Sequence, residues 1–110
     1  MFEDVKAKKV FSFFEKISAI PRGSGNEKAI ADFLEEFAKE RGLFCIRDSA
    51  NNVFMRKCAT DGYEDHAPIM LQGHTDMVCE ANNGVEHDFL RDPIKLVRNG
   101  DILSADGTPL

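Results

Sequence analysis

The chain of 110 residues fits the size of one domain, and its 43% of hydrophobic residues can form a core, so we expect a single folded unit. A formal net charge of -5 gives no electrostatic attraction to nucleic acid or to an anionic membrane, so neither partner is expected. No apolar run approaches the ~20 residues of a membrane span, no secretory leader pattern opens the chain, and its three cysteines cannot all pair, so we expect a reducing cytoplasm as the compartment.

The first predicted element is an amphipathic helix from Phe2 to Ile20. Apolar side chains recur there at helical spacing, and lysines and glutamates occupy the opposite face. Pro21 predicts the end of this helix, because the residue before a proline avoids the helical region of backbone space.

A second amphipathic helix is predicted after a short turn over residues 22–26, and it runs up to Gly42. Ser24 stands three residues before Glu27, which is the spacing of a capping box. We therefore expect Ser24 to cap the second helix. An anion site at this helix terminus is the less favoured interpretation of the same residues.

Two short apolar runs, Leu43–Ile46 and Val53–Met55, flank a turn-rich segment and predict a β-hairpin. After a polar loop, residues 68–71 read Pro-Ile-Met-Leu without polar alternation, which is typical of a strand buried on both faces of a sheet. We expect this strand to join the hairpin in one sheet, with His74 just beyond its carboxyl end.

Near the end of the chain, Ile94–Val97 and Ile102–Leu103 flank the Asn99-Gly100 pair, which favours a tight type I′ hairpin turn. Helices that alternate with strands, one of them fully buried, predict an α/β layered fold. No internal repeat, low-complexity tract or linker marks a domain boundary.

The strongest signal for a functional site is Gly73-His74-Thr75-Asp76, directly after the predicted buried strand. Ligands of open α/β sheets bind outside the carboxyl ends of strands, and residues two apart in extended backbone project to the same side. A metal could therefore bind both His74 and Asp76, or bind the histidine while the carboxylate orients the imidazole. Gly73 is expected to let other backbone approach closely. A histidine hydrogen-bonded to a turn aspartate, with no metal, would give the same motif.

Three separated blocks, in this order, resemble the aminoacyl-histidine dipeptidase (Xaa-His dipeptidase) family of co-catalytic zinc exopeptidases. They are residues 20–27 (Ile-Pro-Arg with Ser-Gly-Asn-Glu), residues 71–78 (Leu-Gln-Gly-His-Thr-Asp-Met-Val) and residues 87–94 (His-Asp-Phe with Asp-Pro-Ile). The resemblance implies a partial three-layer catalytic domain with two amino-terminal helices on a mixed sheet. It also implies two zinc ions and a dipeptide substrate in the complete enzyme. By the same resemblance, His74 ligates one zinc ion, and Asp76 is the catalytic-site aspartate that braces the imidazole without binding metal.

The last residues, Gly107-Thr108-Pro109-Leu110, lie where the family normally has Gly-Thr-Thr-Leu, just before the aspartate that bridges the two metals. Pro109 departs from that pattern. The resemblance therefore implies that residues 1–110 are the amino-terminal part of the catalytic domain, truncated before the bridging ligand and without the family's lid-like domain. A catalytic zinc takes about three protein ligands, so we expect these residues alone to bind zinc weakly and to be inactive.

Two other functions stay open on the sequence alone. The chain could be a non-catalytic α/β binding or interaction module whose unfinished sheet edge is covered by another subunit, and a homo-oligomer is expected because a cut domain exposes apolar surface. Alternatively, Cys79 could act as a nucleophile, although the sequence places no base to activate it. His87 repeats the chemistry of His74 beside Asp88, but we expect it only to form hydrogen bonds at the surface.

Overall fold

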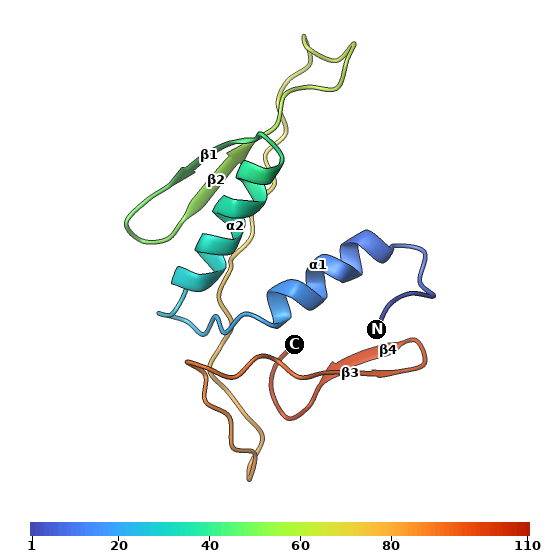
Figure 1. Ribbon diagram of the computed structural model, residues 1–110, viewed down its shortest axis with the longest axis vertical. Helices are drawn as coiled ribbons and strands as arrows, with labels where there is room; N and C mark the ends of the chain where they lie inside the picture. The colour runs from blue at the N-terminus through green and yellow to red at the C-terminus, as the bar shows by residue number, and fades with distance from the viewer. The chain divides into compact units, whose positions relative to one another are not determined.

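The computed structural model describes residues 1–110, and helices and strands share the chain, so the predicted α/β class is confirmed (Figure 1). Residues Met1–Ile30 and Asp76–Leu110 form one compact unit, called unit 1, and residues Ala31–Thr75 form another, called unit 2. In chain order the elements are α1 (Lys8–Ser18), α2 (Lys28–Glu40), β1 (Phe44–Arg47), β2 (Val53–Arg56), β3 (Leu96–Asn99) and β4 (Ile102–Ala105).

The first helix is confirmed, but it begins at Lys8 and not at Phe2. The residues before it form turns, and these turns bring the buried Phe2 ring back onto Phe11, with 4.6 Å between ring centroids. Burial of an aromatic ring outweighs the small gain from one more helical turn. At the other end, Arg22 Nε donates to the carbonyl oxygen of Ile17 at 3.1 Å and so satisfies one of the last carbonyls of α1.

The second helix is also confirmed, but the capping box predicted for it is absent. A tight turn, closed by a hydrogen bond of 2.8 Å from Asn26 N to Gly23 O, comes first and delays the start of the helix to Lys28. Ser24 therefore lies too far from the first turn to cap it, and Gly25 N donates to Glu27 Oε1 at 2.6 Å instead. The prediction for Ser24 was wrong because the helix begins three residues later than the capping pattern requires.

The carboxyl end of α2 follows the sequence expectation closely. Gly42 has a φ of 62°, the left-handed conformation that glycine adopts without strain. Its N–H donates to Lys39 O at 3.1 Å, and Leu43 N donates to Ala38 O at 2.9 Å. These two bonds form a Schellman motif, which ends the helix and redirects the chain into β1.

In unit 2 the predicted first hairpin is confirmed, since β1 pairs antiparallel with β2. The Asp48 carboxylate stabilises the connecting turn by accepting two backbone N–H groups, each at 2.9 Å. Arg47 joins the hairpin to α2, because its guanidinium donates to Asp32 at 2.6 Å and to Glu35 at 2.7 Å. The side chain of Arg47 is only 17% exposed, so these ion pairs are partly shielded from water.

The predicted strand at residues 68–71 is absent, and this corrects the expected mixed sheet. Ile69, Met70 and Leu71 are 88%, 79% and 92% exposed, and the chain forms two separate two-stranded antiparallel sheets. A strand buried on both faces needs neighbours that complete its backbone hydrogen bonds and layers that cover its side chains. No segment of the chain pairs with residues 68–71, so the apolar run stays extended and exposed.

The second hairpin is confirmed in unit 1, where β3 pairs with β4 and Asn99 lies opposite Ile102. The two loop residues are consequently Gly100 and Asp101, one position later than predicted. Gly100 has a φ of 62° and Asp101 does not have a positive φ, which is the pattern of a type II′ turn and not of type I′.

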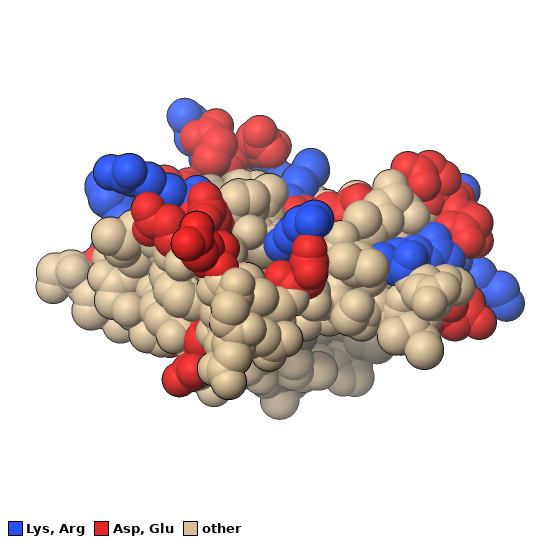
Figure 2. All heavy atoms as spheres, turned by 90° about the horizontal axis from the view of Figure 1, so that it is seen from below, with Lys and Arg blue, Asp and Glu red and all other residues tan.

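The surface carries charges of both signs. On the face drawn in Figure 2, basic and acidic side chains are interspersed and neither sign forms a continuous field. Neither helix has the length and apolar character that crossing a lipid bilayer requires.

The ion pair between Asp4 and Arg98 attaches the amino-terminal turns of unit 1 to β3. It makes the stability of unit 1 depend on pH. Hydrogen bonds from Arg98 hold the pKa of Asp4 at about 2, below its usual 3.8. Because the folded-state pKa is depressed, this stabilisation is complete above about pH 4 and is lost as the pH falls toward 2. We expect Asp4→Asn to flatten the fall in stability over that range, measured by urea unfolding at stepped pH. The matched change Asp61→Asn in the 61–66 loop should leave the pH slope as in the parent chain, and equal slopes for all three proteins would contradict the assignment.

Candidate functional site

The predicted site aspartate lies next to a point where two distant parts of unit 1 are joined. Met77 N donates to Arg22 O at 2.9 Å, and Ser24 N donates to Met77 O at 2.9 Å. These bonds flank a parallel bridge between Gly23 and Met77. The bridge fixes the residues around Gly23 and Met77 side by side in a parallel register. Ser24 and Asp76, which are 52 residues apart in the sequence, are each next to a bridged residue.

Within this junction, Asp76 accepts a hydrogen bond from a side chain that the sequence did not assign to the site. Ser24 Oγ donates to Asp76 Oδ2 at 2.5 Å, a length typical of a hydroxyl donating to an ionised carboxylate. Ser24 Oγ also lies 3.3 Å from Met77 O, but a hydroxyl carries one proton and the shorter contact takes it. The serine expected to cap α2 therefore orients a carboxylate instead.

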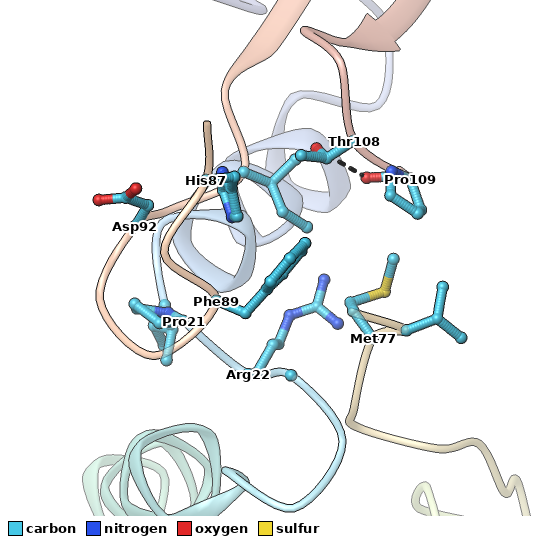
Figure 3. Close-up of a pocket in the computed structure, with 12 residues that line it drawn as sticks. Pro21, Arg22, Met77, His87, Phe89, Asp92, Thr108 and Pro109 are labelled. Carbon is cyan, nitrogen blue, oxygen red and sulfur yellow. Dashed lines mark hydrogen bonds between the residues drawn. The ribbon is translucent and has the colours of Figure 1, made fainter. Parts of the chain in front are cut away.

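Arg22 is the second charged group of this region. Arg22 is only 8% exposed, and its side chain extends between Phe89 and Met77 in the pocket of Figure 3. Burial lowers the pKa of Arg22, and the negative charge of Asp76 opposes that shift. Arg22 and Asp76 therefore attract each other across this region.

Gly23 lies close to the segment that follows Asp76, and a side chain at this position would make Cys79 turn away. A Cβ atom at this position would lie 2.6 Å from Cys79 Sγ, which is nearer than real Cβ contacts come. Cys79 is exposed and forms no disulfide, as is true of Cys58, and Cys45 is also a free thiol. The nucleophile hypothesis for Cys79 stays untested.

His87 differs from its sequence interpretation. It is half-buried and lines the same pocket as Arg22, with its ring 4.7 Å from that of Phe89 between centroids. The ring thus packs beside an aromatic neighbour two residues along the chain, and the expected hydrogen bonding of His87 stays a prediction. Both Arg22 and His87 fall inside the blocks that carry the family resemblance, which is the signal that could have drawn them into the site.

His74 lies in an exposed, irregular segment at the end of unit 2, and it belongs neither to a helix nor to a strand. A Cβ atom at Gly73 would meet open space, so the expected close backbone approach at this glycine is wrong for this chain. Asp76 belongs to unit 1, and its surroundings are those described above. The metal role of His74 and the bracing role of Asp76 stay predictions.

The chain by itself does not fit a zinc centre. Nowhere do three or more histidine, cysteine, aspartate or glutamate side chains gather closely enough to hold a metal ion. A catalytic zinc takes about three protein ligands, and His74 supplies one.

Comparison with known proteins found no matching family model, but both a curated protein and a solved structure are similar to this chain. The cytosol non-specific dipeptidase of Escherichia coli (strain K12) is 41% identical over 101 residues, which is 92% of this chain and 21% of that protein. The crystal structure of aminoacylhistidine dipeptidase from Vibrio alginolyticus matches with a TM-score of 0.90 and 36% identity, covering 97% of this chain and 22% of that one. This chain thus spans about a fifth of the length of each relative.

Both similar proteins carry the name of a dipeptidase, and the matches cover 92% and 97% of this chain. More narrowly, the resemblance to the aminoacyl-histidine dipeptidase family is confirmed. The chain is related to that family over a region equal to about a fifth of such an enzyme.

The buried guanidinium of Arg22 should be needed for the stability of unit 1. In Arg22→Met, the carbonyl of Ile17 keeps its bond from Ile20 N but loses the charged donor, and Asp76 loses the nearby positive charge, so we expect a loss of roughly 1–3 kcal/mol. The measurement is urea unfolding followed by circular dichroism. Arg91→Met is the matched control, because the Arg91 side chain is 85% exposed and should be nearly neutral. Equal stability of the two variants would contradict this role of Arg22.

Proposed function

We propose that this chain forms the amino-terminal part of the catalytic domain of a cytoplasmic, dinuclear zinc dipeptidase that hydrolyses aminoacyl-histidine dipeptides. The observation that carries the proposal is the TM-score of 0.90 at 36% identity to a solved aminoacylhistidine dipeptidase. The relative from Escherichia coli carries the name of a non-specific dipeptidase, which supports the reaction more strongly than the choice of a carboxy-terminal histidine.

In this proposal His74 supplies one zinc ligand, and Asp76 orients its imidazole. Ligands that lie outside residues 1–110 complete the metal pair, because a single histidine cannot hold a catalytic zinc. The hydrogen bond from Ser24 to Asp76 supports the proposal, since a carboxylate that orients another side chain must itself be held. The dipeptide is the partner that such a site serves.

Ligand count gives the first test of this function. We expect the 110-residue chain to show no hydrolysis of an aminoacyl-histidine dipeptide in added zinc, and the full-length protein that carries it to be active. In the full-length protein, His74→Ala should remove most of the activity, because it deletes a metal ligand. His66→Ala is the matched control, since His66 is an exposed histidine in the same unit whose ring lies tilted beside that of Tyr63. Zinc-dependent turnover by the 110-residue chain, lost on His74→Ala, would contradict the need for outside ligands.

A second candidate function, an interaction module, is favoured by one observation. Ile69, Met70 and Leu71 expose three adjacent apolar side chains on unpaired extended backbone, which is a ready template for pairing with another strand. We therefore propose that the isolated chain forms a homo-oligomer. The zinc content of the full-length protein separates the two functions: a bound metal pair supports an enzyme, and a metal-free oligomer supports a module.

Association through residues 69–71 can be tested by adding one charge. We expect the parent chain to sediment as a dimer or larger species at high concentration, and Met70→Glu to shift it toward monomer, because a buried carboxylate in an apolar contact is costly. Lys57→Glu is the control, since it changes charge at an exposed position of the same unit. A monomeric parent chain at high concentration would refute the proposal.

A further inference from the structure

The turn before α2 is built so that one hydroxyl points at one carboxylate. Asn26 N donates to Gly23 O at 2.8 Å and closes a four-residue turn, with Ser24 as its second residue. Gly25 has a φ of 88°, which a side chain at that position would resist. The turn conformation therefore fixes the direction in which Ser24 projects.

The same turn is tied to the segment that carries Asp76, and it does not rely on the hydroxyl for this. Ser24 N donates to Met77 O, and Met77 N donates to Arg22 O, both at 2.9 Å. These backbone bonds hold the two segments together whatever the side chain at position 24. The Ser24 hydroxyl is therefore not needed to hold the two segments together. It donates to Asp76 Oδ2 at 2.5 Å.

Asp76 is constrained by more than one group. The Ser24 hydroxyl holds one carboxylate oxygen, and the buried Arg22 brings a positive charge near the same carboxylate. A carboxylate on a single-bond side chain otherwise samples several rotamers. Fixing Oδ2 sets the plane of the carboxylate and hence the direction of its other oxygen.

We propose that Ser24 is a positioning residue that locks the rotamer of the Asp76 carboxylate, so that Asp76 is oriented before it meets the imidazole it braces. The effect of Ser24 on catalysis rests on the proposed function, because it requires that Asp76 braces a zinc-binding histidine. The structural part of the inference, the locked rotamer of Asp76, rests only on the geometry of unit 1.

The rotamer can be measured on the 110-residue chain without any activity. Three-bond couplings between Hα and the two Hβ protons of Asp76, measured by NMR, should show a single rotamer in the parent chain. In Ser24→Ala the couplings should average, and in Ser24→Thr, which keeps a hydroxyl, they should return to the single-rotamer pattern. Slow amide exchange of Met77 in both variants would show that the backbone junction is intact. A single Asp76 rotamer that persists in Ser24→Ala overturns the proposal.

The catalytic consequence is measured in the full-length protein with zinc. We expect Ser24→Ala to lower kcat about 10-fold with KM nearly unchanged, within the 10–100-fold range expected for Asp76→Ala. Ser24→Thr should restore most of kcat. In the Asp76→Ala background, Ser24→Ala should cause no further loss, because a residue that acts only through Asp76 has nothing left to orient.

The outcomes separate this proposal from the proposed function. Additive losses in the double variant overturn the positioning role of Ser24 and leave the dipeptidase function standing. Full activity in both His74→Ala and Asp76→Ala refutes the proposed site, and the NMR couplings of Asp76 then decide the positioning role by themselves.

Discussion

The junction between the turn at residues 22–24 and Met77 is the constraint on which unit 1 depends. Two backbone hydrogen bonds and one parallel bridge join segments that are far apart in the chain. Because of this register, Ser24 reaches Asp76, Arg22 enters the pocket beside Met77, and Gly23 gives room to Cys79. The candidate site is therefore a product of one long-range contact between a loop before a helix and an extended segment, and regular secondary structure contributes little to it.

Local sequence signals predicted the local elements well. Helical spacing gave both helices, Gly42 predicted the end of α2, and turn composition predicted both hairpins. Each of these features depends on residues within a few positions of one another. Two boundaries were predicted wrongly. The first helix begins after Phe2 because the Phe2 ring packs on Phe11. The turn type at Asn99 differs because the strands pair one residue later than expected.

Signals that depend on distant partners failed. Residues 68–71 have the composition of a doubly buried strand, but burial on two faces is a property of the neighbours and not of the segment itself. Ser24 has the spacing of a cap, but its acceptor lies 52 residues away. The family resemblance selected the blocks that contain Ser24 and Arg22, although it did not say what these side chains contact. Sequence could thus point to the site and could not give its geometry.

The division of the chain also has a consequence for how the protein folds during synthesis. Unit 1 is discontinuous, because residues 31–75 are inserted between its two parts. On the ribosome, which makes the amino terminus first, α1 and the turn at Ser24 must wait without their partners until Met77 has emerged. Unit 2 is contiguous and its hairpin is local, so it can form in that interval and shorten the loop that must close. Unit 2 can therefore fold before the contact that closes unit 1 is made.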